Sequence, residues 1–357
     1  MGDMTDSPAP RCYDIEQTYD WNYDHAPAPV VRDAIVVPGT WDFCGLPVAS
    51  PLGVPAGPLL NGKWCLYYAS LGFDVLTYKT VRSSHRDCYG LPNLQPVASN
   101  QLTGSEPQVS ATADMQGSWA VSFGMPSRAP EIWRRDVEAT RQQLPAGKLL
   151  VVSVVGTVQE EWSIDDLAND YARCAKWAVD SGADAVETNF SCPNVATCDG
   201  QLYQQPNDAR IVAERVRAAI GSVPYIVKIG HVQSRNDAIA LLAAIGSKID
   251  ALAMTNSIAT VVHSGDDMLF DGQRRGICGD SIRAASIAQV KQFAALIADS
   301  GLSTKIIGVG GIGKAEHVRA YLQAGAHACH LATAAMVEPE VALQIRRSLA
   351  AQSGQVV

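Results

Sequence analysis

Short runs of aliphatic and β-branched residues recur along the chain and alternate with longer amphipathic stretches. The runs are hydrophobic at consecutive positions, which is typical of parallel strands buried on both faces. Eight of them follow one another, the first leading from about residue 46 to Pro55 and the others covering 74–78, 149–154, 185–188, 225–228, 251–254, 305–309 and 328–331. This rhythm predicts an α/β fold, a closed TIM (β/α)8 barrel.

The amphipathic stretches predict the outer helices of that barrel. The clearest begins at Ser163, an N-cap residue with Asp166 at its third position, and ends before Gly182. Its apolar stripe includes Leu167 and Tyr171. Further helices are predicted over 208–220, 234–245, 284–300, 314–324 and 339–349.

Residues 1–45 precede the predicted barrel, which we assign to 46–357. They contain Trp21, Trp41 and several tyrosines and prolines. Aromatic residues are scarce in disordered tails, so we expect an ordered N-terminal extension packed on the barrel.

Two later segments exceed the needs of a minimal barrel. Residues 81–148 form a long insertion after strand 2, which is too long for a structureless loop and must hold extra strands and a helix near 131–143. The polar, glycine-rich stretch 263–279 predicts a mobile loop over the barrel mouth.

Composition and charge narrow the function classes. The chain has 357 residues, 47% hydrophobic and 18% charged, with a net charge of −8 that argues against binding to nucleic acid. No run of about 20 uncharged apolar residues occurs and the start is polar, so we expect a cytoplasmic protein without a membrane partner. The nine cysteines never have Cys-x-x-Cys spacing, so no metal site is expected.

The end of the fourth predicted strand carries the most specific signal. It reads Asn189-Phe190-Ser191-Cys192-Pro193-Asn194, with two amides flanking a thiol at the barrel's carboxyl end, where catalytic side chains project. Any one of these residues fits a buried cysteine or a turn asparagine, but the whole string favours a site. The residues leave two roles open for the thiol, as a nucleophile or as a proton-transfer group.

Glycines and lysines at other strand ends point to a phosphorylated ligand. Gly308-Val309-Gly310-Gly311 follows strand seven and Ala332-Thr333-Ala334 follows strand eight, the usual phosphate cradle of this barrel. Lys79 and Lys228 are either solvated strand-end lysines or cations that point into the mouth. Asn256 after strand six adds an amide there.

These motifs, in this order, resemble the dihydroorotate dehydrogenase family, and also the pyrimidine-oxidising domain of dihydropyrimidine dehydrogenase. The similarity runs from about residue 46 to 350. The motifs that carry it are Pro55-Ala56-Gly57, Gly72-Phe73 through Lys79-Thr80, Asn189-x-Ser191-Cys192-Pro193-Asn194, Val227-Lys228, Asn256-Ser257, Gly276-x-x-Gly279, Gly310-Gly311 and Ala332-Thr333-Ala334.

The resemblance implies a small dihydropyrimidine-like substrate and FMN at the barrel mouth. It assigns Cys192 as the base for the C5 proton, flavin N5 as the hydride acceptor and Lys79 as a group that helps to ionise the thiol. The flavin residues it implies are Ala56, Gly57, Lys79, Thr80, Asn189, Lys228, Ser257, Gly279, Gly310, Gly311, Ala332 and Thr333. The substrate residues it implies are Lys79, Asn189, Asn194, Asn256, Ser122, Phe123 and Gly124.

Members with cysteine in the Asn-x-Ser-Cys-Pro-Asn string are the soluble type, whereas those with serine are membrane-associated quinone users. Cys192 therefore places the chain with the soluble members, which commonly self-associate as homo-oligomers. Neither the electron acceptor nor the direction of reaction is fixed by these motifs.

One position departs from the family pattern. A further substrate asparagine is expected on the long loop after strand 2, where the chain reads Ala120-Val121-Ser122-Phe123-Gly124 and places Val121. Loss of an amide removes two donors and an acceptor. We therefore expect a ring whose C6 substituent is smaller, less charged or differently placed than carboxylate.

Two other functions compete with this interpretation. A tRNA dihydrouridine synthase-like FMN reductase would also use a barrel cysteine, but it needs a basic RNA-binding domain that the acidic chain does not show. A barrel that binds a phosphorylated ligand without redox chemistry would not need Cys192, both lysines and three amides.

Overall fold

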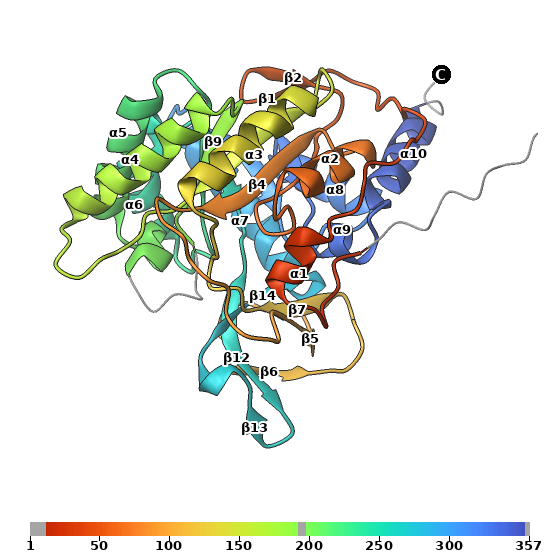
Figure 1. The fold of residues 1–357 in the computed structure, drawn as a ribbon, viewed down its shortest axis with the longest axis horizontal. Coiled ribbons are helices and arrows are strands. Elements are labelled where there is room, and N and C mark those ends of the chain that lie inside the picture. The colour runs from red at the N-terminus through yellow and green to blue at the C-terminus, as the bar shows by residue number, and fades with distance from the viewer. Residues whose placement is uncertain (1–11, 192–197, 354–357) are drawn as a thin grey trace, which may run out of the picture.

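The computed structural model describes residues 12–191 and 198–353, in which eight parallel strands close into a barrel. Each strand coincides with a predicted run, so the predicted TIM barrel is confirmed (Figure 1). In barrel order the strands are β3 (Leu52–Val54), β4 (Val75–Val81), β8 (Leu149–Val154), β9 (Ala185–Asn189), β10 (Tyr225–Lys228), β11 (Ala251–Met254), β15 (Lys305–Val309) and β16 (Ala328–His330).

The apolar core of the barrel consists of two clusters, one inside the ring of strands and one between the strands and the helices. Val151, Ala185 and Ile226 belong to a cluster that fills the interior, while their chain neighbours Val152 and Val186 pack outward with the helices. Successive strand residues point to opposite faces. The continuous hydrophobic runs in the sequence therefore reflect two apolar faces.

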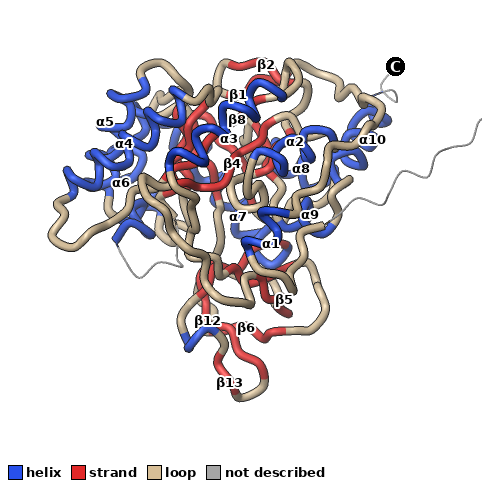
Figure 2. The backbone as a smooth tube through the Cα atoms, viewed as in Figure 1, coloured by secondary structure: helices blue, strands red, loops and turns tan. Residues whose placement is uncertain are grey.

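Helices surround the barrel (Figure 2). They are α2 (Gly62–Ser70), α3 (Pro130–Gln143), α4 (Ile164–Asp180), α5 (Pro206–Ile220), α6 (Arg235–Ile245), α7 (Arg283–Asp299), α8 (Ala315–Gln323), α9 (Thr333–Val337) and α10 (Val341–Ser353), with short 3-10 turns at Cys198–Gln204, Gly246–Lys248, Phe270–Gly272 and Asp280–Ile282. The predicted capping box at Ser163 and Asp166 is present at the start of α4. Helix α2 was not predicted.

A second sheet lies beyond the carboxyl ends of the barrel strands (Figure 1). Its strands, in spatial order, are β13 (Asp267–Met268), β12 (Ile258–Ser264), β14 (Arg275–Gly279), β7 (Ser118–Val121), β5 (Leu94–Ala98) and β6 (Gln108–Ala111). The extra strands and helix predicted in the insertion are thus confirmed. The loop predicted over 263–279 is wrong, because strand β14 pairs with the distant β7 and forms the centre of this sheet.

The N-terminal extension covers both ends of the barrel. Strands β1 (Trp41–Phe43) and β2 (Leu46–Val48) form a hairpin at the amino end, where the Phe43 ring stacks on His330 at a centroid distance of 5.8 Å. The predicted first strand is therefore split, since β2 pairs with β1 and only β3 enters the barrel. Helix α1 (Tyr19–Asp24) lies on α2, where the Asn61 side-chain amide donates to the Tyr23 carbonyl at 2.7 Å.

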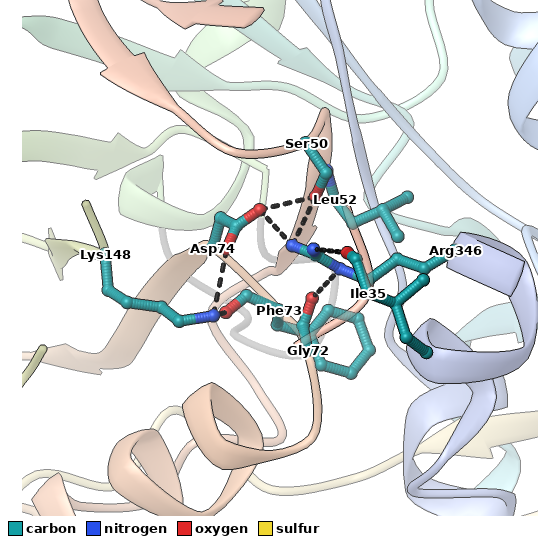
Figure 3. A network of polar contacts seen from close by, with 8 residues as sticks. All are labelled: Ile35, Ser50, Leu52, Gly72, Phe73, Asp74, Lys148 and Arg346. Carbon is teal, nitrogen blue, oxygen red and sulfur yellow. Dashed lines mark hydrogen bonds and ion pairs between the residues drawn. The ribbon is translucent and has the colours of Figure 1, made fainter. Parts of the chain in front are cut away.

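A buried ionic network ties the last helix to the amino end of the barrel (Figure 3). The Asp74 carboxylate pairs with Arg346 of α10 and, at 2.9 Å, with Lys148. The Arg346 guanidinium also donates to the carbonyls of Gly72 at 2.6 Å and of Ile35 at 2.7 Å. One arginine thus joins the extension, the barrel and α10.

Candidate active site

Two connected cavities open at the carboxyl end of the barrel. Their volumes are about 470 Å3 and about 110 Å3. Five residues line both of them, namely Asn256, Cys278, Val309, Ala332 and Thr333. The cavities therefore form one elongated site, with a narrow end over the barrel axis and a wide end beside strands β15 and β16.

The narrow end is built on barrel strand ends. The turn after β3 brings Ala56 and Gly57 to its wall, β4 brings Lys79 and Thr80, and β10 brings Lys228. Lys79 and Lys228 are only 6% and 4% exposed, and Lys228 Nζ donates to the Ala56 carbonyl at 3.2 Å. Both lysines line the cavity. They therefore point into the barrel mouth and are not solvated strand-end lysines.

Two asparagines at the narrow end hold the chain that leads to Cys192. Asn189 Oδ1 accepts from the Ser191 amide at 3.0 Å, and Asn256 Nδ2 donates to the Ser191 carbonyl at 2.9 Å. Asn189 Nδ2 contacts Met125 Sδ at 3.6 Å. The predicted residues Cys192 and Asn194 themselves lie outside the described residues.

The wide end contains the predicted phosphate cradle. Gly279, Gly310 and Gly311 line it with the Ala332-Thr333 turn. A Cβ on Gly311 would lie 2.7 Å from Arg283 Cβ and 2.9 Å from the Gly279 carbonyl oxygen, and its φ of +64° also favours glycine. The glycine is therefore required by the packing of the loop itself.

Two cations at the wide end were not predicted from the sequence. Arg283 and Lys314 line it, and Arg283 NH1 donates to the Gly311 carbonyl at 3.0 Å. Both positions lie at helix starts, where the sequence alone does not distinguish a cavity-lining cation from a solvated one. Arg283 is also paired with Asp280, which lines the same end. Positive charge beside glycine backbone suits a phosphate.

The second sheet supplies the outer wall of the narrow end. Trp119, Val121, Phe123 and Gly124 line it. Phe123 and Gly124 are predicted substrate residues, and Val121 is the position that departs from the family pattern. Ser122 does not line it, because its hydroxyl accepts a hydrogen bond from Arg275 Nε at 2.9 Å. Trp119 was missed, since only its pairing opposite Cys278 brings it to the barrel.

Two further thiols lie near the site, and burial keeps both protonated. Burial raises the pKa of Cys278 to about 11, against the opposing positive charge of Lys228. Burial likewise raises the pKa of Cys88 to about 12, although the Lys79 charge lowers it. Neither thiol has the depressed pKa that a reactive thiolate needs.

A larger cavity of about 560 Å3 adjoins the site. Of the residues that the structure describes, it shares only Ser257 with the narrow end, and it contains none of the other predicted flavin residues. Within the described ranges, no cluster of three or more His, Cys, Asp or Glu side chains could hold a metal ion, and no helix is long and apolar enough to cross a membrane.

Comparison with known proteins assigns the family. The sequence model of the family described as dihydroorotate dehydrogenase matches residues 40–352. The chain belongs to the dihydroorotate dehydrogenase family. It is a dihydroorotate dehydrogenase-like oxidoreductase of pyrimidine metabolism, in a family that uses FMN. The match favours this function over the two alternatives that the sequence left open.

Individual relatives agree with the family match. Dihydroorotate dehydrogenase of Dictyostelium discoideum is 31% identical over 93% of this chain and 95% of its own length. The catalytic subunit of dihydroorotate dehydrogenase B (NAD(+)) of Desulforudis audaxviator (strain MP104C) is 26% identical over 86% of this chain and 90% of its own length. The crystal structure of the Eimeria tenella enzyme in complex with ferulenol has a TM-score of 0.73 at 16% identity, covering 98% of this chain and 94% of that one, and supports the fold.

Proposed function

We propose that the chain binds FMN in the elongated site and oxidises the CH–CH bond of a dihydroorotate-like dihydropyrimidine. One observation carries the proposal: the site is lined by every flavin residue that the family resemblance implies. The ring would lie at the narrow end over Lys228 and Ala56. The phosphate would lie at the wide end between the glycine loops, near Arg283.

The shape and chemistry of the cavity fit this cofactor. A Cβ on Gly57 would meet nothing within 4 Å, so this backbone faces open space that a flat ring can approach. Trp119 and Phe123 give the narrow end apolar walls on which a flat ring can pack, whereas the glycine loops and Arg283 line the wide end. A flavin mononucleotide likewise has a flat ring at one end and a phosphate at the other.

The proposed chemistry separates proton and hydride. The bound FMN supplies a hydride acceptor at N5. Cys192 would accept the C5 proton of the substrate, and the Lys79 charge would favour the thiolate that this step needs. Asn189 and Asn256 fix Ser191, the residue before Cys192, and so would help to position the base.

The substrate would lie against the outer wall, where Val121 is one of the lining residues. Its isopropyl group offers no hydrogen bond, and the neighbouring Ser122 hydroxyl is engaged by Arg275. A polar C6 substituent would lose partners there. We therefore infer a substrate whose C6 substituent differs from carboxylate in size, charge or position.

The test of cofactor binding is the flavin content of the purified chain. We expect FMN to co-purify at close to one per chain and to be released as FMN on denaturation. A colourless protein that cannot be reconstituted with FMN would overturn the proposal.

A further inference from the structure

A carboxyl group lies inside the barrel beneath the narrow end of the site, and the proposed chemistry does not use it. Glu187 of β9 is 1% exposed, and its Oε1 has no hydrogen-bond partner among the described residues. A buried carboxylate is costly unless a charge or donor compensates it. Such a group is a candidate for a functional role.

The alternation of the strands fixes where this carboxyl points. Ala185, two residues earlier on β9, belongs to the apolar cluster of the barrel interior, and Asn189, two residues later, lines the cavity. Glu187 points to the same side of the strand as these two residues, because side chains two positions apart in a strand share a face. It therefore lies between the apolar interior and the cavity.

Neighbouring strands complete a polar layer made of Thr80, Ser153, Glu187 and Lys228. Ser153 is the direct cross-strand partner of Glu187, and its hydroxyl is 3.0 Å from the Thr80 hydroxyl. Lys228 follows Ile226, the partner of Glu187 on the other side, by two residues. The two ends of the layer, Thr80 and Lys228, both line the cavity.

The electrostatics of the polar layer link Glu187 to Lys228. Burial raises the pKa of Glu187, while the positive charge of Lys228 and a hydrogen bond from Ser153 lower it. The carboxyl thus responds to charge at the cavity and can change protonation when that charge changes.

Other ionisable groups facing the same interior are few among the described strands. Lys79 lies at the mouth on β4, and Lys305 lies at the opposite, amino end on β15. His330 on β16 is neutral, because burial and the Lys228 charge lower its pKa to about 3. Among the interior-facing positions of the described barrel strands, Glu187 is therefore the one acid.

We propose that Glu187 is a positioning residue whose charge stabilises the Lys228 ammonium under the flavin ring, and that it takes up a proton when the ring is reduced. The inference rests on the proposed function. Reduction by hydride adds two electrons and one proton to the ring, which leaves one extra negative charge. A proton taken from solvent by the Glu187 carboxylate restores the net charge of the site.

The test compares the midpoint potential of FMN bound to the wild type and to Glu187→Gln as a function of pH. Gln keeps a hydrogen-bonding side chain but removes the titrating charge. In the wild type, reduction should take up one more proton across part of the pH range than in the variant. Above that range the variant should favour reduced over oxidised FMN by roughly tenfold to hundredfold more than the wild type does.

Thr188→Val is the matched control on the same strand. Thr188 is buried on the outward face, where its hydroxyl lies 3.0 Å from the Tyr225 hydroxyl, so it shares the strand but not the polar layer. We expect this variant to keep the wild-type potential and its pH dependence.

Ser153→Ala provides a second measurement that does not depend on the folding of Glu187→Gln. Loss of the Ser153 hydrogen bond should raise the pKa of Glu187 further, so the additional proton uptake should persist to higher pH. Equal pH profiles in wild type, Glu187→Gln and Ser153→Ala, in protein that still binds FMN, would overturn this inference alone. Failure of the wild type to bind FMN would overturn both it and the proposed function.

Discussion

Two buried lysines distinguish the mouth of this barrel from an apolar protein core. Lys79 and Lys228 are 6% and 4% exposed and line the cavity, where the Lys228 ammonium donates to the Ala56 carbonyl. Burying an ammonium is unfavourable without an acceptor or an opposite charge. Their placement accordingly favours an electron-rich ring and an anionic substrate in the cavity.

Cys192→Ala tests the proposed base. The variant should retain FMN, since Cys192 is not among the flavin residues that the family resemblance implies, but flavin reduction by substrate should slow by about 10²–10⁴-fold. Stopped-flow absorbance under anaerobic conditions measures this rate. Cys12→Ala is the control, because that thiol is exposed and forms its hydrogen bond with Val337. Unchanged reduction in Cys192→Ala would require another base.

Val121→Asn tests the origin of substrate preference. If the wall at Val121 disfavours a polar C6 substituent, each missing hydrogen bond costs about 1–3 kcal/mol and the new amide should raise kcat/KM for dihydroorotate by roughly tenfold or more. Steady-state kinetics with dihydroorotate and dihydrouracil provide the comparison. Efficient turnover of dihydroorotate by the wild type, with no gain in the variant, would instead favour plain dihydroorotate oxidation.

Among the elements, the loop after β15 contains two glycines that differ in how much space a side chain would have. These are Gly311 and Gly313. Gly311→Ala should displace the loop, because its Cβ would meet Arg283 and the Gly279 carbonyl at a positive φ. A Cβ on Gly313 would lie 3.4 Å from Ala334 Cβ, so Gly313→Ala is a mild change in the same loop. We expect the first variant to lose FMN affinity at least about tenfold. Fluorescence titration of apo-protein with FMN measures it, and equal affinities in the two variants would contradict the role of this turn.

The elements also show how far the sequence could predict the site. Residues at barrel strand ends, such as Asn189 and Lys228, were placed correctly because parallel strands all end at one face. Strand β14 was mistaken for a loop, since its partner β7 lies more than 150 residues earlier in the chain. Trp119 was missed for the same reason: non-local pairing leaves no local signal in the sequence.

The extension contributes at this scale as well. The rings of Tyr13 and Tyr19 lie 6.0 and 6.2 Å from that of Phe123, in edge-to-face geometry. Phe123 lines the narrow end of the site, so the extension supports the cavity wall from behind. The sequence predicted the packing of an aromatic-rich extension but not the wall that it reaches.

At the scale of the whole molecule, Arg346 holds three parts of the chain together. Arg346→Met would leave Asp74, which is 1% exposed, with only Lys148 and Ser50 as side-chain partners in the described part of the chain. Loss of one partner from a buried ion pair costs about 3–5 kcal/mol. Urea denaturation should show that the free energy of unfolding falls by about this amount.

Arg210→Met on α5 is the control for that measurement. Arg210 pairs with Glu214 one turn away on the exposed surface. Exposed pairs contribute about 0–1 kcal/mol. If the free energy of unfolding fell by the same small amount in both variants, the Asp74–Arg346 pair would not stabilise the fold as the structure indicates.

In the proposed function, the family's barrel carries a site for FMN and for a dihydropyrimidine. Anaerobic mixing of the FMN-loaded protein with dihydroorotate, dihydrouracil, dihydrothymine and C6-modified analogues tests it most directly. We expect at least one of these substrates to bleach the flavin in a single turnover, and Cys192→Ala to slow this step. A flavin that none of them bleaches would contradict it.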